Sequence, residues 1–352
     1  MNDNGFPQGA VLVFGGSGGI GQGVALEFAR AGVPVAVGYR SKADVAERVA
    51  RDIRGEGVAA TTHCVDVTDS AQVDAALAAA SGAHGRVHTV VWAAGPFVNQ
   101  RHIGDMTHDD WRRAIDVETI GFFVAAKAAL PHFRASGGGS FVTLGSAGHL
   151  RWPERDGLSV APKAANEALV KGLAREEGRY DIRANSILVG VIEAGMFPVL
   201  LEQGQFDQAW IDETQKMLAL KRWGKAHDVG RAAVFLASDR AGYITGQQLN
   251  VSGGVWGVAA RRSGKFIRTT VSERSVVLRA DIARHPFRKS STTRADIPIG
   301  SRIASVPGSD RWMRTHRYSP CLVTHDRASA SRAPGQRSHF CNAFPTYSSA
   351  HD

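Results

Sequence analysis

Cysteine is scarce in this chain, which has only Cys64, Cys321 and Cys341 in 352 residues. Three thiols give no disulfide framework for a protein of this size, and none has a second pair of ligands at zinc spacing. Apolar runs long enough to span a bilayer are missing, and the first ten residues lack the basic and apolar regions of a signal peptide. We therefore expect a cytoplasmic protein without a metal site or a membrane segment.

Excess positive charge is confined to one end of the chain. Residues 261–352 hold 15 arginines and 2 lysines against 6 acidic residues, a net charge of +11, whereas the rest of the chain has −2. That end shows no sustained helix or strand periodicity, and too little apolar surface recurs for a core. We predict an ordered domain over 1–258 and a disordered Arg/Ser-rich extension over 259–352. Its sequence leaves open whether it is a native extension or a reading-frame artefact. It has no nucleic-acid-binding motif, so we expect no nucleic-acid partner.

A glycine-rich segment follows the first apolar run, Val11–Phe14. Gly15, Gly19 and Gly21 precede a helical pattern that continues to Arg30. Glycines let backbone N–H groups and the helix N-terminus approach a pyrophosphate without a Cβ in the way. The segment predicts a dinucleotide phosphate loop, and the alternative is a plain glycine-rich turn.

An acidic residue is missing after the second predicted strand, 34–38, where an NAD-selective site usually has one. Tyr39, Arg40, Ser41 and Lys42 stand there instead. A guanidinium presents a planar set of donors that suits a 2′-phosphate, and it has no acceptor for a free ribose hydroxyl. The segment predicts NADP(H) in preference to NAD(H). The alternative is that Arg40 and Lys42 only solvate a loop.

Strand and helix patterns alternate along the first 257 residues. Further predicted strands cover 87–92, 140–144 and 182–188, each followed by apolar residues at helical spacing. The alternation predicts an α/β fold, with one doubly wound parallel sheet and helices on both faces. A chain of this length is ample for one such core.

Four short motifs occur at fixed places in this alternation. They are the spaced glycines, Asp66-Val67 after the third strand, Ala93-Ala94-Gly95 after the fourth, and Ser146 with Lys163 beyond the fifth. Together they resemble the short-chain dehydrogenase/reductase family over about residues 8–257. The resemblance implies a Rossmann-type sheet, a nicotinamide cofactor and hydride transfer between a carbonyl and an alcohol.

The catalytic half departs from the family's pattern. Ser159 stands where the family has its tyrosine, thirteen residues after Ser146 and four before Lys163. Glu118 replaces the proton-relay asparagine, and Trp92 replaces the asparagine of the turn before Ala93. A phenol beside an ammonium group can protonate the developing alkoxide, whereas an aliphatic alcohol is a much poorer acid.

Three replacements for the missing acid are open. A water held between Ser159 and Lys163 is one, and proton supply from Glu118 is another. His149, in the loop after Ser146, is the third, although a loop histidine at an entrance is more often incidental. For Glu118 the alternative is a solvated or ion-paired helix residue.

The resemblance assigns roles to individual residues. Catalytic roles fall to Ser146, Ser159, Lys163 and Glu118. Cofactor contacts fall to Gly15, Ser17, Gly19, Ile20, Gly21, Tyr39, Arg40, Ser41, Asp66, Val67, Ala93, Ala94, Gly95, Lys163, Gly190 and Ile192.

The apolar segment 193–223 stands at the family's substrate-binding insertion. It predicts a hydrophobic carbonyl or alcohol substrate, with ordinary packing as the alternative. We interpret the chain as an NADP(H)-dependent oxidoreductase, with 3-oxoacyl-type ketoreduction among the reactions, that forms a homodimer or homotetramer as the family does. The alternative is a cofactor-binding protein with little or no redox activity, serving as a sensor, partner subunit or non-redox catalyst.

Overall fold

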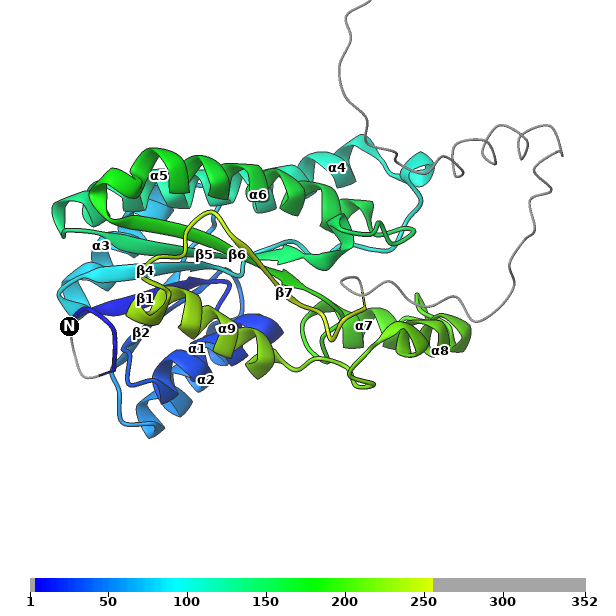
Figure 1. Cartoon of the computed structure of the whole chain (residues 1–352), viewed down its shortest axis with the longest axis horizontal. Coiled ribbons are helices and arrows are strands. Elements are labelled where there is room, and N and C mark those ends of the chain that lie inside the picture. Colours follow the sequence, from blue (N-terminus) through cyan, green and yellow to red (C-terminus); the bar gives the residue numbers. More distant parts are fainter. Residues whose placement is uncertain (1–3, 256–352) are drawn as a thin grey trace, which may run out of the picture. The chain divides into compact units, whose positions relative to one another are not determined.

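The computed structural model describes residues 4–255 (Figure 1). Seven parallel strands form one sheet in the order β3-β2-β1-β4-β5-β6-β7. The strands are β1 Ala10–Phe14, β2 Val35–Tyr39, β3 Ala60–Cys64, β4 Val87–Trp92, β5 Gly139–Ser146, β6 Ile182–Val189 and β7 Gln248–Val251. The predicted parallel α/β sheet is confirmed. The predicted extension over 259–352 lies outside the described residues, and the boundary at 258 stays a prediction.

Helices cover both faces of the sheet (Figure 1). They are α1 Gly19–Arg30, α2 Ala43–Gly55, α3 Ser70–His84, α4 His108–Ile115, α5 Gly121–Ala135, α6 Gly157–Glu177, α7 Met196–Glu202, α8 Gln208–Met217 and α9 Ala226–Ala237. One core lies between the sheet and α1, α2 and α9, and the other between the sheet and α3, α5 and α6. This is the doubly wound arrangement that the alternating pattern predicts.

Strand β1 shows how an apolar run becomes the centre of both cores. Val11 and Val13 pack with α1, α2 and α9, whereas Leu12 and Phe14 belong to the opposite core. Successive strand side chains point to opposite faces, so a strand buried on both sides must be apolar throughout. All four side chains are 0–1% exposed. Each contributes about 1.5–3 kcal/mol of transfer free energy.

One predicted helix differs from its expectation. The family resemblance implies one long central helix through Trp111 to Phe123, but α4 and α5 are joined by a π-helical segment, Asp116–Ile120. A π-helical turn inserts an extra residue, which shifts the side chains and redirects a backbone carbonyl. Glu118 lies inside this segment, and its carbonyl accepts a hydrogen bond from Asn166 Nδ2 at 3.1 Å.

All strands run the same way, so their carboxyl ends share one edge of the sheet. The loops that follow β1, β2, β4, β5 and β6 gather there, and α7 and α8 lie beyond the sheet at one side (Figure 1). In open parallel sheets the binding crevice forms at this edge. The fold therefore brings motifs from five separate loops together.

Candidate active site

A single cleft of about 560 Å³ connects the predicted cofactor and catalytic residues. Most of them line it: Ser17, Gly19, Ile20, Gly21, Arg40, Ser41, Val67, Ala93, Ala94, Gly95, Ser146, Ser159, Lys163, Gly190 and Ile192. Gly15, Tyr39, Asp66, Glu118 and His149 are not among its lining residues. The predicted residues thus meet in space, with a few of them behind the cleft wall.

The phosphate loop fits an anion. Helix α1 starts at Gly19 with Gly18 as its N-cap; no side chain caps it, and its first turn holds no acidic residue. Its first N–H groups and the positive end of its dipole therefore remain for a pyrophosphate. The loop has no room for side chains, because a Cβ on Gly21 would lie 2.2 Å from the Gly15 carbonyl oxygen.

The end of β2 carries the exposed side chains of Arg40, Ser41 and Lys42. Arg40 also lines a second cavity of about 480 Å³, together with Asp66, Arg112 and Arg113. Hydrogen bonds from the backbone N–H and hydroxyl of Thr68 lower the pKa of Asp66, and the nearby Arg40 lowers it further. The sequence interpretation missed Arg112 and Arg113, which come from α4 and add positive charge beside Arg40.

The catalytic end combines the end of β5 with the first turns of α6. Ser146 ends β5, and its Oγ accepts a hydrogen bond from Gly148 N–H at 3.0 Å. Ser159 and Lys163 are four residues apart on α6, so they share one face of that helix and both line the cleft. Ser146, Ser159 and Lys163 therefore all line the same cleft.

Glu118 is the ion-pair partner of Lys163. Their side chains bond directly at exposures of 3% and 19%. Trp92 Nε1–H donates to the other carboxylate oxygen of Glu118 at 3.3 Å, as does Asn166 Nδ2 at 3.3 Å. The substitutions at 92 and 118 are thus partners in one buried network. Gly95 completes it, because a Cβ there would lie 2.7 Å from Glu118 Oε2.

His149 has a different environment from these residues. Its Nδ1 is buried and makes no hydrogen bond within the described part of the chain. It stands on the short 3₁₀ turn that follows Ser146, outside the set of residues that line the cleft. Its geometry gives no support to a proton-transfer role.

Asp156 is a cleft residue that the sequence interpretation missed. It occupies the N-cap position of α6, but its carboxylate accepts no hydrogen bond from the helix. Its Oδ1 instead accepts a hydrogen bond from Gln100 Nε2 at 3.0 Å. Burial raises the pKa of Asp156 to about 6, against a lowering by Gln100 and by the charge of Lys163. Its only sequence signal was an acidic residue just before a helix.

Four aromatic rings form one side of the substrate end. Phe197 contacts Phe206, Trp210 and Trp223 at centroid distances of 5.7, 6.1 and 5.4 Å. Phe206 stacks on Trp210 at 4.1 Å. Phe197, Phe206 and Trp210 also line the cleft beside Met196 and Leu200. We call these four rings the aromatic wall. They pack against one another, and three of them also present an apolar surface to the cleft, so segment 193–223 fits both ordinary packing and a hydrophobic binding surface.

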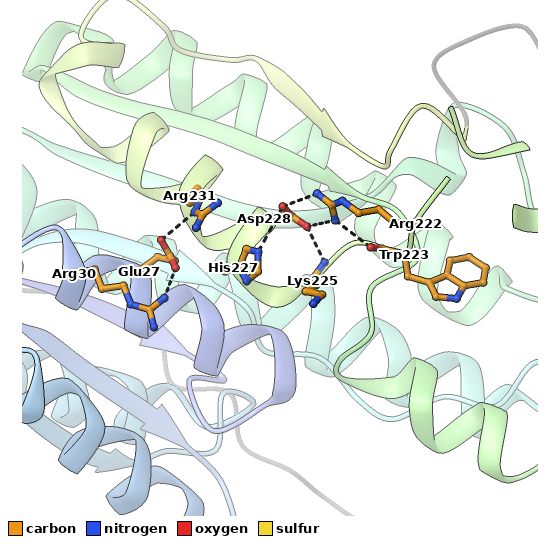
Figure 2. A network of polar contacts seen from close by, with 8 residues as sticks. All are labelled: Glu27, Arg30, Arg222, Trp223, Lys225, His227, Asp228 and Arg231. Carbon is orange, nitrogen blue, oxygen red and sulfur yellow. Dashed lines mark hydrogen bonds and ion pairs between the residues drawn. The ribbon is translucent and has the colours of Figure 1, made fainter. Parts of the chain in front are cut away.

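A charged network fixes the segment that carries Trp223 (Figure 2). Asp228, in the first turn of α9, accepts hydrogen bonds from Arg222 Nη1 at 2.7 Å, from Arg222 Nη2 at 3.0 Å and from Lys225 N–H at 2.8 Å. Arg222 also donates to the Trp223 carbonyl at 3.1 Å. The Arg222 hydrogen bonds lower the pKa of Asp228 to about 2.

An Asp228→Asn protein is expected to melt about 2–4 °C lower than the native protein at pH 7. The pKa of Asp228 in the folded protein lies below that of an ordinary aspartate, so the stabilisation is present at neutral pH and is lost as the pH falls towards 2. Thermal melts of both proteins from pH 7 to 2 check this. A difference in melting temperature that stays constant down to pH 2 would contradict the ion-pair explanation.

The sheet, the phosphate loop and the cleft at the strand ends define a nucleotide-binding α/β protein of the doubly wound class. A family model described as enoyl-(acyl carrier protein) reductase matches residues 15–256. The chain belongs to the short-chain dehydrogenase/reductase family of oxidoreductases. Members of this family bind a nicotinamide cofactor and act on small molecules.

Individual relatives agree with this assignment. The chain is 30% identical over 247 residues to the 3-oxoacyl-[acyl-carrier-protein] reductase FabG of Staphylococcus aureus, covering 70% of this chain and 98% of that one. It is 32% identical over 246 residues to oxidoreductase UcpA of Salmonella typhimurium, covering 69% and 92%.

Two solved structures are similar as well. A short-chain dehydrogenase/reductase from Mycobacterium ulcerans gives a TM-score of 0.67 at 31% identity, covering 71% of this chain and 90% of that one. A 7α-hydroxysteroid dehydrogenase complexed with NADH and 7-oxo glycochenodeoxycholic acid gives 0.66 at 28% identity, covering 72% and 97%.

Residues 4–255 lack two features, a membrane-spanning helix and a cluster of metal ligands. No helix in that range combines the length and apolar character needed to cross a membrane. The same residues contain no group of three or more His, Cys, Asp or Glu side chains placed to hold a metal ion.

Proposed function

We propose that this protein is an NADP(H)-dependent oxidoreductase that interconverts an apolar ketone and its secondary alcohol. The observation that carries the proposal is the shared cleft, in which Ser146 and Lys163 face the same space as the open N-terminus of α1. Relatives named as a 3-oxoacyl reductase and a hydroxysteroid dehydrogenase support carbonyl chemistry. The aromatic wall supports a hydrophobic substrate, and 3-oxoacyl compounds belong among the first ones to test.

Each end of the cleft has its proposed task. The first N–H groups of α1 bind the pyrophosphate, and Arg40 binds the 2′-phosphate. Asp66 and Val67 contact the adenine side of the cofactor. Ala93, Ala94 and Gly95 support the ribose region, and Gly190 with Ile192 hold the nicotinamide end. The bound cofactor supplies or accepts the hydride. Ser146 donates a hydrogen bond to the carbonyl oxygen, and Lys163 orients the ribose.

Replacing Arg40 with alanine is expected to weaken NADPH binding about 10–100-fold and to leave NADH binding nearly unchanged. Only NADPH carries the 2′-phosphate that the guanidinium is proposed to bind. Nicotinamide fluorescence titrations of both nucleotides measure the two dissociation constants. Arg48→Ala on the exposed side of α2 is the matched control, because Arg48 lines neither cavity. A native protein that binds neither nucleotide would refute the proposed function.

A cofactor-binding protein with little redox activity is the second candidate. Ser159 lacks a phenol, and Lys163 is already paired with Glu118. Both features favour binding without fast turnover. A Ser159→Tyr protein distinguishes the two candidates: a large gain in turnover indicates an eroded site, whereas a loss indicates that the native arrangement is the working one.

We also propose a homodimer or homotetramer. On α5, Ala125, Ala126 and Ala129 are buried in the chain's own core and are not available for such a contact. Ile120 and Phe123, on the π-helical segment and α5, are instead 46% and 51% exposed. Their apolar side chains support a contact between copies on this side, and sedimentation velocity measures the assembly state.

A further inference from the structure

Carbonyl reduction needs a proton as well as a hydride. The inference concerns the source of that proton and rests on the proposed function. The hydroxyls of Ser146 and Ser159 are aliphatic and are poor acids near neutral pH. The ammonium of Lys163 is bonded to Glu118, whose carboxylate also holds Trp92 and Asn166. Glu118 is 2% exposed and lies behind the cleft wall. The serines, Lys163 and Glu118 are therefore poor candidates for the proton donor, which leaves a water between Ser159 and Lys163 or another side chain of the cleft.

Asp156 lies where such a group is needed. It precedes Ser159 by three residues at the start of α6, and its backbone carbonyl accepts hydrogen bonds from Ser159 N–H at 3.1 Å and Val160 N–H at 2.9 Å. Residues three apart in a helical turn are neighbours on its surface. Asp156, Ser159, Lys163 and Ser146 all line one cleft.

The carboxylate of Asp156 has no part in holding the helix. An aspartate at an N-cap normally accepts hydrogen bonds from the first N–H groups of the helix, as Asp69 does for Ala71 and Gln72 at 2.9 and 3.3 Å. Asp156 makes no such bond. It also has no ion pair within 4 Å in the described part of the chain. Its one side-chain hydrogen bond within the described residues comes from Gln100, so the carboxylate is neither used as a helix cap nor neutralised by an ion pair.

The segment before α4 holds this carboxylate, and both Gln100 and Asp156 line the cleft. Gln100 donates to Asp156 through Nε2, while Gln100 N–H donates to Gln205 Oε1 at 2.8 Å. The backbone of the next residue, Arg101, bonds to the Arg155 carbonyl at 2.8 Å. Contacts from two distant segments therefore fix the position of one carboxyl group.

The charges around Asp156 come from three elements. Lys163 on α6 acts on it directly and favours its ionised form. Glu154 and Arg155 stand in the same loop, and the guanidinium of Arg101 turns to Asp110 at 3.2 Å. Burial favours the neutral carboxyl group and outweighs the effect of the Lys163 charge, so the pKa of Asp156 rises to about 6. Both protonation states are then accessible near neutral pH, as a group that gives and takes back a proton requires.

We propose that Asp156 is the general acid and base of this site, in place of the tyrosine that the chain lacks. In reduction, hydride from the nicotinamide adds to the carbonyl carbon, and the C=O π electrons become an alkoxide lone pair. The Asp156 carboxyl O–H bond breaks and its proton forms the alcohol O–H. Solvent then reprotonates the carboxylate. In oxidation the Asp156 carboxylate takes the hydroxyl proton while hydride passes to the oxidised cofactor.

The test uses an Asp156→Asn protein, in which an isosteric side chain keeps the Gln100 contact and cannot transfer a proton. With NADPH and either α-tetralone or ethyl acetoacetate, we expect kcat to fall about 100-fold or more, with NADPH affinity unchanged. The native reduction rate should fall as the pH rises through about 6, because the acid must hold its proton, and the oxidation rate should fall as the pH drops through that value. Asp156→Asn should lose both pH dependences.

A second measurement needs no turnover. In protein labelled with carbon-13 at aspartate carboxyls, we expect one resonance that titrates near pH 6 and is absent from Asp156→Asn. Asp105→Asn is the matched control, because Asp105 is exposed and does not line the cleft, so its kcat and pH profile should equal the native ones.

The outcomes separate the inference from the proposed function. Equal kcat and equal pH profiles in the native and Asp156→Asn proteins overturn the role of Asp156 and leave the oxidoreductase standing. The native protein could instead bind NADPH but reduce neither ketone, while the Ser159→Tyr variant reduces one of them. That result overturns the proposed function and the inference together. A carboxyl resonance of Asp156 that titrates near pH 4 also overturns the inference.

Discussion

A Gly21→Ala protein is expected to lose about 100-fold or more in NADPH affinity, which corresponds to about 2.7 kcal/mol. The new Cβ would lie 2.2 Å from the Gly15 carbonyl oxygen, 2.9 Å from the Gly15 carbonyl carbon and 3.1 Å from the Gly16 Cα. All three contacts are with backbone, so the loop must shift as a whole. The first N–H groups of α1 then no longer meet the pyrophosphate. Fluorescence titration with NADPH measures the loss.

A second glycine provides the matched control. Gly82 lies inside α3, and a Cβ there meets nothing within 4 Å. Gly82→Ala should therefore leave NADPH affinity unchanged and raise the free energy of unfolding by about 0.5–1 kcal/mol. Gly21→Ala binding that equals the native value would show that the loop is not the phosphate site. Circular dichroism of both variants separates lost binding from lost folding.

Removing the carboxylate of Glu118 is expected to have the largest effect on stability. Glu118→Gln leaves the ammonium of Lys163 without its partner on a wall that is only partly open to water. Breaking a buried pair in this way costs about 3–5 kcal/mol, and the cleft-side exposure of Lys163 reduces this to about 2–3 kcal/mol. For an ordered part of this size the melting temperature should fall by about 5–10 °C.

A double-mutant cycle isolates the pair itself. Lys163→Met leaves Glu118 buried and unpaired, and the double variant Glu118→Gln/Lys163→Met removes both charges. The double variant should lose less free energy of unfolding than the two single variants lose together, and the difference, the coupling energy, should be about 2 kcal/mol. Glu213→Gln, which breaks an exposed pair with Lys216 on α8, should not move the melting temperature. Additive single and double losses would show that the Glu118–Lys163 contact contributes nothing.

An ion-paired Glu118 was one of the two alternatives from the sequence, but its partners were not foreseen. Trp92 and Glu118 are twenty-six positions apart and look like two independent departures from the family's pattern. The sheet brings the end of β4 against the π-helical segment, where the indole N–H bonds to the carboxylate. Sequence spacing cannot express this contact, because it depends on an extra residue in a helical turn.

Asp156 was missed for a different reason. An acidic residue just before a helix reads as an N-cap, and Asp69 confirms that reading elsewhere in the chain. The carboxylate of Asp156 has another partner because Gln100, fifty-six residues earlier, lies beside it. Its raised pKa follows from burial by the cleft walls, which only the assembled loops provide.

The sequence by itself determined the local and periodic features of this protein. The alternation of apolar runs specified a parallel sheet with two covered faces, and the glycine spacing specified the loop after β1. The basic residues after β2 predict a preference for NADP(H), which stays a prediction. Such features depend on backbone geometry and on neighbouring residues, which sequence records directly. The tertiary structure alone decided which side chains share the cleft. The pairing of Glu118 with Lys163, the Gln100 contact of the Asp156 carboxylate and the partial burial of that carboxylate all arise from contacts between distant segments. These contacts exist only once the chain has folded.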